Sequence, residues 1–97
     1  MTYEIRTTLV FDKWFKKLRD RQAVMAIVQR LDRVKTGLLG DVESVGGGVS
    51  EMRIFVGKGY RLYFIIQNVE VVLLLCGGDK PSQQRDIIKA KDLAKNL

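Results

Sequence analysis

Histidine is absent from this chain, and cysteine and proline each occur only once in its 97 residues. Without imidazole, His-dependent catalytic triads and His/Cys metal sites are excluded, and Cys76 has no disulfide partner within the chain. No run approaches the roughly 18 apolar residues of a membrane span, and the first residues lack the layout of a signal peptide. We therefore expect a cytoplasmic protein in which Cys76 is a buried apolar side chain and any catalysis proceeds without histidine.

Positive charge, in contrast, is abundant. The chain carries 17 Lys and Arg against 11 Asp and Glu, a net charge of +6, and 46% of its residues are apolar. This composition is typical of one compact domain, which we assign to residues 1–97. A charge surplus on so small a surface favours a polyanionic partner, although it would also simply keep a globular protein in solution.

Helical periodicity marks the first half of the chain. Apolar residues at i, i+3, i+4 and i+7 form one stripe across 11–18, and Thr8 is placed to cap that helix. A second stripe runs from Ala23 to Val34 and stops at Gly37. We predict a helical hairpin after a short strand at 3–7.

The first helix has two contrasting faces. We assign its apolar stripe, Trp14 and Phe15 included, to the core rather than to a ligand site. The opposite side is typical of a solvated face, with RNA binding as the alternative. Its basic residues are Lys13, Lys16, Lys17, Arg19 and Arg21.

The second half reads as strands separated by glycines. The run 71–75 (VVLLL) is apolar at every position, as expected of a central strand covered on both faces, and Gly77-Gly78 is predicted to end it. The expected strands are 42–45, 49–56, 60–67 and 70–76. A final helix, capped by Asp79 or Ser82, should bury Ile87, Ile88, Ala90, Leu93 and Ala94. The prediction is an α+β fold, β-α-α-β-β-β(-β)-α, with an antiparallel sheet of four to five strands.

Strand register predicts a candidate site. Closing a tight hairpin around 57–59 puts Arg53 opposite Tyr63, Phe55 opposite Arg61 and Glu51 opposite Ile65, on the face away from Leu62 and Phe64. Two arginines and a tyrosine on an open sheet surface would hold phosphate and base, with Lys58 at the hairpin tip. Lys80, beside a helix N-terminus, would reinforce an anion site. The alternative is an ordinary Arg53–Glu51 ion pair with Tyr63 covering the sheet.

Several motifs carry a family resemblance. They are residues 14–20 (WFKKLRD), 45–54 (VGGGVSEMRI), 57–64 (GKGYRLYF) and 74–80 (LLCGGDK), followed by Gln83, Asp86, Ile87 and Ala90. In this order they resemble the RelE/ParE toxin superfamily, and most closely its HigB-like addiction-module killer proteins. The resemblance implies a type II toxin with a RelE-like fold, whose sheet is open and basic on one side, that cleaves mRNA in the ribosomal A site. ParE-like members instead inhibit DNA gyrase, and a non-catalytic RNA-binding module is a further alternative.

The implied mechanism needs no metal or cofactor, because the 2′-hydroxyl of the substrate attacks the adjacent phosphate. Arg53 and Arg61 would bind that phosphate, Tyr63 would stack on or orient a base, and Lys80 would supply charge or a proton. Glu51, or a lysine of lowered pKa, would accept the 2′-proton. The general base stays open, because relatives that use histidine have no counterpart here. Candidate substrate-binding residues are Lys58, Tyr60, Gln83 and Arg85.

The resemblance also implies partners. They are the ribosome with its mRNA and a cognate antitoxin, usually a HigA-like helix-turn-helix protein, which would bring the toxin to operator DNA. No membrane partner is expected.

Overall fold

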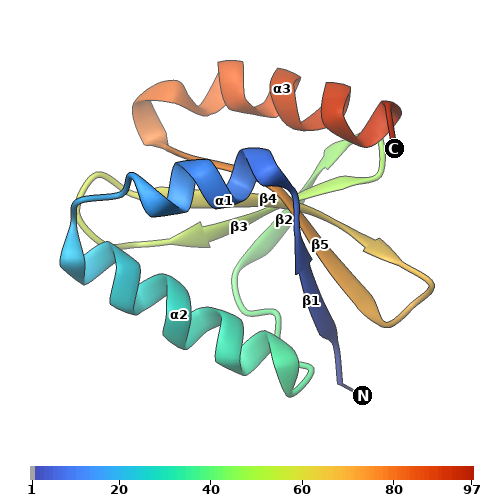
Figure 1. The fold of residues 1–97 in the computed structure, drawn as a ribbon, viewed down its shortest axis with the longest axis horizontal. Helices are drawn as coiled ribbons and strands as arrows, with labels where there is room; N and C mark the ends of the chain where they lie inside the picture. Colours follow the sequence, from blue (N-terminus) through green and yellow to red (C-terminus); the bar gives the residue numbers. More distant parts are fainter. Residues whose placement is uncertain (1) are drawn as a thin grey trace.

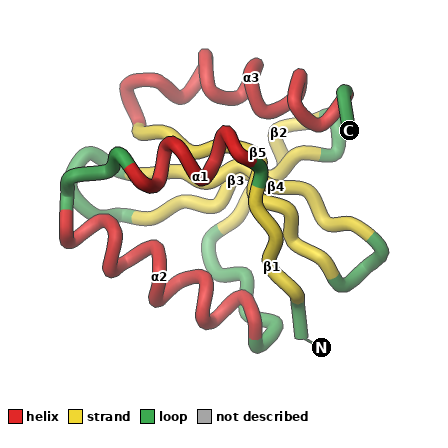
Figure 2. Tube along the Cα trace, viewed as in Figure 1, coloured by secondary structure: helices red, strands yellow, loops and turns green. Residues whose placement is uncertain are grey.

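A computed structural model describes residues 2–97 and contains a five-stranded mixed sheet with three α-helices (Figures 1 and 2). The fold is therefore α+β, as predicted. The elements are β1 (Glu4–Thr7), α1 (Leu9–Lys16), α2 (Arg21–Lys35), β2 (Val42–Gly46), β3 (Val49–Ile54), β4 (Tyr60–Gln67), β5 (Val71–Asp79), a 3₁₀ turn (Lys80–Ser82) and α3 (Gln83–Lys95). This is the predicted order, with the segment at 42 a true strand.

The strands lie in the order β1-β5-β4-β3-β2. All neighbouring pairs are antiparallel except β1 and β5, which run parallel from the pair Glu4/Val71 to the pair Thr7/Leu74. The prediction of a wholly antiparallel sheet is therefore wrong at β1. Local hydrophobic patterns identify a strand, but they carry no information about the direction of a partner far along the chain.

The helical hairpin packs on one face of the sheet. The Thr8 hydroxyl accepts the N–H of Phe11 (3.0 Å) and donates to the carbonyl of Leu75 (2.6 Å), so the cap also ties α1 to β5. Asp20 caps α2 by accepting the N–H of Ala23 (3.1 Å). The core beneath the helices comprises Phe11, Ala23, Ile27 and Val34 with Met52, Ile54, Leu62, Phe64, Val72 and Leu74. Both predicted helices and the predicted Thr8 cap are confirmed.

The opposite face is covered by α3, which lies across the sheet from α2 (Figure 1). Its inward stripe contains Ile87, Ala90, Leu93 and Ala94 and packs on Val49, Tyr63, Leu73, Leu75 and Cys76. The open, basic face implied by the resemblance is therefore wrong, whereas the double coverage predicted from residues 71–75 is confirmed. Ile88 was also expected inside but is 70% exposed, because a helical residue one position from Ile87 points about 100° away from it.

The β3–β4 register differs from the prediction by two residues. Arg53 pairs with Arg61 and Glu51 with Tyr63, because Phe55 and Val56 belong to a five-residue connection rather than to the strand. A shift of two residues keeps every side chain on its face. Arg53, Arg61, Tyr63 and Glu51 therefore still share one face, as predicted, although their pairings are wrong.

Gly77 and Gly78 do not end β5, which continues to Asp79. A Cβ on Gly77 would lie 2.4 Å from the Trp14 ring, and one on Gly78 would lie 1.8 Å from the Asp86 carboxylate. The two glycines thus allow side chains of α1 and α3 to touch the backbone of β5, an interior strand of the sheet. Asp79 caps the following 3₁₀ turn, whereas Ser82 makes no side-chain cap to α3.

Across residues 2–97, none of the helices has the length and apolar character needed to cross a bilayer.

Candidate functional site

Glu51 is the centre of a buried polar cluster between the sheet and α3. The residue is 2% exposed. Its Oε2 accepts hydrogen bonds from the Tyr63 hydroxyl (3.0 Å) and from Nε2 of Gln83 (2.9 Å) at the start of α3. The β3–β4 pairing therefore brings two of these side chains together, and α3 supplies the third.

Two arginines flank this carboxylate. Nε of Arg53 lies 3.8 Å from Oε1 of Glu51, and Nε of Arg61 lies 3.7 Å from Oε2. Both nitrogens are buried, and neither has a hydrogen-bond partner among the described residues. Arg53 also pairs with Asp41 and Glu43, whereas the Arg61 side chain is 10% exposed. Two cations thus face one buried carboxylate and retain unused N–H donors.

Lys80 joins this cluster through the backbone of Gly59. The Gly59 carbonyl accepts the backbone N–H of Lys80 (2.8 Å) and Nη1 of Arg61 (3.3 Å). The Lys80 side chain is exposed. Sequence reasoning therefore named residues that the fold does bring together: Glu51, Arg53, Arg61, Tyr63, Lys80 and Gln83, which we call the Glu51 cluster.

Three of the expected roles are wrong. Tyr63 has no exposed surface, so its ring does not stack on a base, and its hydroxyl donates a hydrogen bond to Glu51. Tyr60, expected to bind substrate, is 6% exposed and donates to the carboxylate of Asp20 (3.3 Å). Glu51 is enclosed by Tyr63, Gln83 and the two arginines, so its carboxylate is not accessible to a 2′-hydroxyl. The common cause is the covering of this face by α3 and of the other by α1 and α2.

Burial raises the pKa of the Tyr63 phenol well above its ordinary value, and the hydrogen bond to Glu51 adds to the effect. Above pH about 10 the unfolded chain loses this proton while the folded protein keeps it, so stability should fall as the pH rises. We expect the urea midpoint to decline between about pH 9 and 11 more steeply in the native protein than in Tyr63→Phe. Superimposable pH profiles for the two proteins would contradict the buried position of this phenol.

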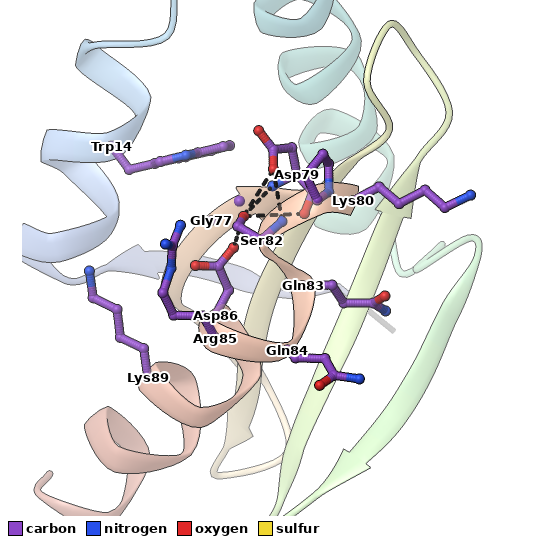
Figure 3. Close-up of a pocket in the computed structure, with 12 residues that line it drawn as sticks. Trp14, Gly77, Asp79, Lys80, Ser82, Gln83, Gln84, Arg85, Asp86 and Lys89 are labelled. Carbon is purple, nitrogen blue, oxygen red and sulfur yellow. Dashed lines mark hydrogen bonds between the residues drawn. The ribbon is translucent and has the colours of Figure 1, made fainter.

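An open hollow of about 1210 Å³ lies beside the cluster, between α1, the end of β5 and the start of α3 (Figure 3). Figure 3 shows the Trp14 indole over Gly77, with Arg85 and Lys89 extending toward it and Lys80 extending away. Asp86 is 8% exposed and accepts a hydrogen bond from the Ser82 hydroxyl, which itself accepts the N–H of Asp79 (3.3 Å). The base of the hollow is therefore a fixed polar network, and its rim is cationic.

Two smaller hollows share Trp14 with the first one. One is lined by Lys17, Arg19 and Lys58, and the other by Lys13, Lys17 and Lys89. We call the three together the Trp14 depression. Seven cationic side chains line it against the three carboxylates of Asp20, Asp79 and Asp86, a surplus of four positive charges within a chain of net +6.

Sequence reasoning missed the centre of this depression. Trp14 was assigned to the core because helical spacing places it in the apolar stripe; it does pack against the core, but it is only partly buried and also lines the hollows. Lys58 and Arg85, predicted to bind substrate, do line the hollows. A signal was present in Gly77-Gly78, since adjacent glycines in an apolar strand indicate close approach of another group.

No protein-family model matches the chain. A protein of Haemophilus influenzae (strain ATCC 51907 / DSM 11121 / KW20 / Rd), described as an uncharacterized protein, is 48% identical to it over 97 residues, which are 100% of this chain and 98% of that protein.

Proposed function

We propose a function for this chain, which belongs to the same family as the Haemophilus influenzae protein. In this proposal the chain is the toxin of a type II toxin–antitoxin module and cleaves mRNA on the ribosome. The motif resemblance to HigB-like members of the RelE/ParE superfamily supports the proposal, and a RelE-like topology is part of it. The observation that carries it is the meeting of Arg61 and Lys80 at the Gly59 carbonyl, beside a hollow with a cationic rim.

The proposed reaction requires few catalytic groups from the protein. A ribose 2′-hydroxyl attacks the adjacent phosphate, so the substrate supplies the nucleophile and the protein holds the backbone in line. Arg61 is buried beside the Glu51 carboxylate and close to the backbone of Lys80, so it contributes a fixed positive charge, while the exposed Lys80 ammonium group meets the phosphate oxygens. Such fixed charges stabilise the charge that develops on the phosphate in the transition state.

Proton transfer falls to Lys80 in this proposal. It is the one exposed ionisable side chain of the Glu51 cluster, and its ammonium group would protonate the departing 5′-oxygen while the proton of the attacking 2′-hydroxyl passes to water. Glu51, Gln83 and Tyr63 act through Arg61 by fixing its position.

Purified ribosomes, a defined message and the purified protein test the proposed function. We expect ribosome-dependent cleavage within the reading frame, read out by primer extension, and no cleavage of the same message without ribosomes. A supercoiling assay with DNA gyrase runs beside it. An intact message with inhibited supercoiling would favour the ParE-like alternative, and an intact message that is merely bound would favour a non-catalytic RNA-binding module.

The proposed partner is an antitoxin that blocks the toxin and links it to operator DNA. A small helix-turn-helix protein encoded by the neighbouring reading frame is the expected form. The ribosome as target places the proposed activity in the cytoplasm.

A further inference from the structure

Trp14 is held rigidly at the point where the three hollows meet. One side of its indole lies against Gly77, whose missing side chain makes the contact possible because a Cβ there would be 2.4 Å from the ring. Phe11 supports it from the preceding turn of α1, with ring centroids 5.8 Å apart and planes tilted by 50°. The indole nonetheless keeps exposed surface. An aromatic ring that is both fixed and accessible is suited to stacking with a planar ligand.

The cationic side chains around this ring are all exposed. Lys89 lines the first and third hollows, Lys17 lines the second and third, and Lys80 lies on the far side of the first. A polyanion crossing the Trp14 depression would therefore meet a cation on either side of the indole.

We propose that the Trp14 depression binds single-stranded RNA, with an unpaired base stacked on the indole and the flanking phosphates held by Lys17 and Lys89. Aromatic rings combined with a positively charged groove are the general means of holding single strands, because every base has a π-face. A paired base has no free face for the ring, so a duplex does not fit. An acidic peptide would pair with the lysines but has no planar group for the indole.

This inference rests on the proposed function for the choice of RNA, and it extends that function. Trp14 lines one side of the first hollow and Lys80 lines the other. A strand stacked on Trp14 therefore continues toward Arg61, so the indole contacts a nucleotide close to the bond to be cleaved. Trp14 would then influence which sequences are cut.

The only tryptophan of the chain reports directly on this contact. Titration with a six-nucleotide single-stranded RNA should quench the fluorescence of Trp14 to saturation, while an RNA duplex of the same sequence and inorganic polyphosphate should leave it nearly unchanged. Equal quenching by polyphosphate and RNA would overturn the stacking claim. So would binding of the RNA, seen by anisotropy of a labelled strand, without any quenching.

Matched variants separate stacking from charge. By anisotropy, Trp14→Leu should bind the RNA about tenfold more weakly than Trp14→Phe, which keeps a ring. Lys17→Gln with Lys89→Gln should lower the slope of log affinity against log salt by about 1.4, since each phosphate contact on a single strand contributes about 0.7. Lys95→Gln, at the far end of α3, should leave the slope unchanged. Circular dichroism and urea titration check that each variant is folded.

The outcomes also distinguish the two proposals, because these binding assays need neither ribosomes nor cleavage. Cleavage on ribosomes without quenching by RNA would remove the Trp14 inference and leave the nuclease. Saturable quenching with no ribosomal cleavage would remove the nuclease and leave the RNA site. Displacement of the RNA by an acidic peptide with equal quenching would contradict the RNA site.

Discussion

Replacing Glu51 by alanine should lower the free energy of unfolding by about 3–5 kcal/mol, the usual cost of removing one partner from a buried ion pair. Glu51 is 2% exposed and faces both Arg53 and Arg61. Without its carboxylate, Arg61 remains buried beside a cavity, and the Tyr63 hydroxyl and the Gln83 amide each lose an acceptor. The loss should appear as a lower urea midpoint with an unchanged slope.

Glu43 provides the matched control, because it pairs with the same Arg53 from the edge strand β2, where its side chain is exposed. Its side chain is 63% exposed, so Glu43→Ala should change stability by about 0–1 kcal/mol. Glu51→Gln keeps the shape and removes only the charge, and it should fall between the two. Equal effects of Glu51→Ala and Glu43→Ala would show that burial does not set the strength of this cluster.

Lys80→Ala should slow ribosomal cleavage by about 10²–10³-fold, the range observed when one donor to a transition-state charge is lost. Its side chain is exposed and the backbone N–H that binds Gly59 is retained, so the fold should be unaffected. Initial rates at saturating ribosomes measure the effect on kcat.

Lys80→Arg should restore part of the rate, because it keeps a charge although it is a poorer proton donor. Lys95→Ala, equally exposed but at the other end of α3, should cleave at the normal rate. Arg61→Ala is a less informative variant, because Arg61 is buried against Glu51 and its loss would affect folding as well as chemistry. Undiminished cleavage by Lys80→Ala would exclude Lys80 from the reaction.

Sequence patterns predicted the elements well where the cause is local. Thr8 caps α1 as predicted, because its side chain accepts the N–H of Phe11 only three residues away. The strand predicted at 60–67 has those bounds in the structure. The alternation of Leu62 and Phe64 fixed the buried face even though the register was off by two residues, since strand faces repeat with a period of two.

The site was only partly predictable, because its form depends on α3 docking on a surface formed much earlier in the chain. Residue types indicated that Arg53, Arg61 and Glu51 share a face, but no local pattern shows that a distant helix covers that face. The apolar run at 71–75 did require such a cover, and it conflicted with the open face implied by the resemblance. The apolar run predicted the covered face correctly, because leaving a row of leucines exposed to water costs free energy in any protein family.

The parallel pairing of β1 with β5 has a consequence for how the chain acquires its structure. Among the described strands, β1 pairs only with β5, which follows it by more than 60 residues and separates it from the rest of the sheet. Contacts between the two ends of a chain form late and slow folding, because a long loop must first be closed. β5 also supplies Gly77 beneath Trp14 and precedes Lys80. The Glu51 cluster requires α3 and the Trp14 depression requires both α1 and the end of β5, so each of them forms only after segments far apart in the sequence have come together.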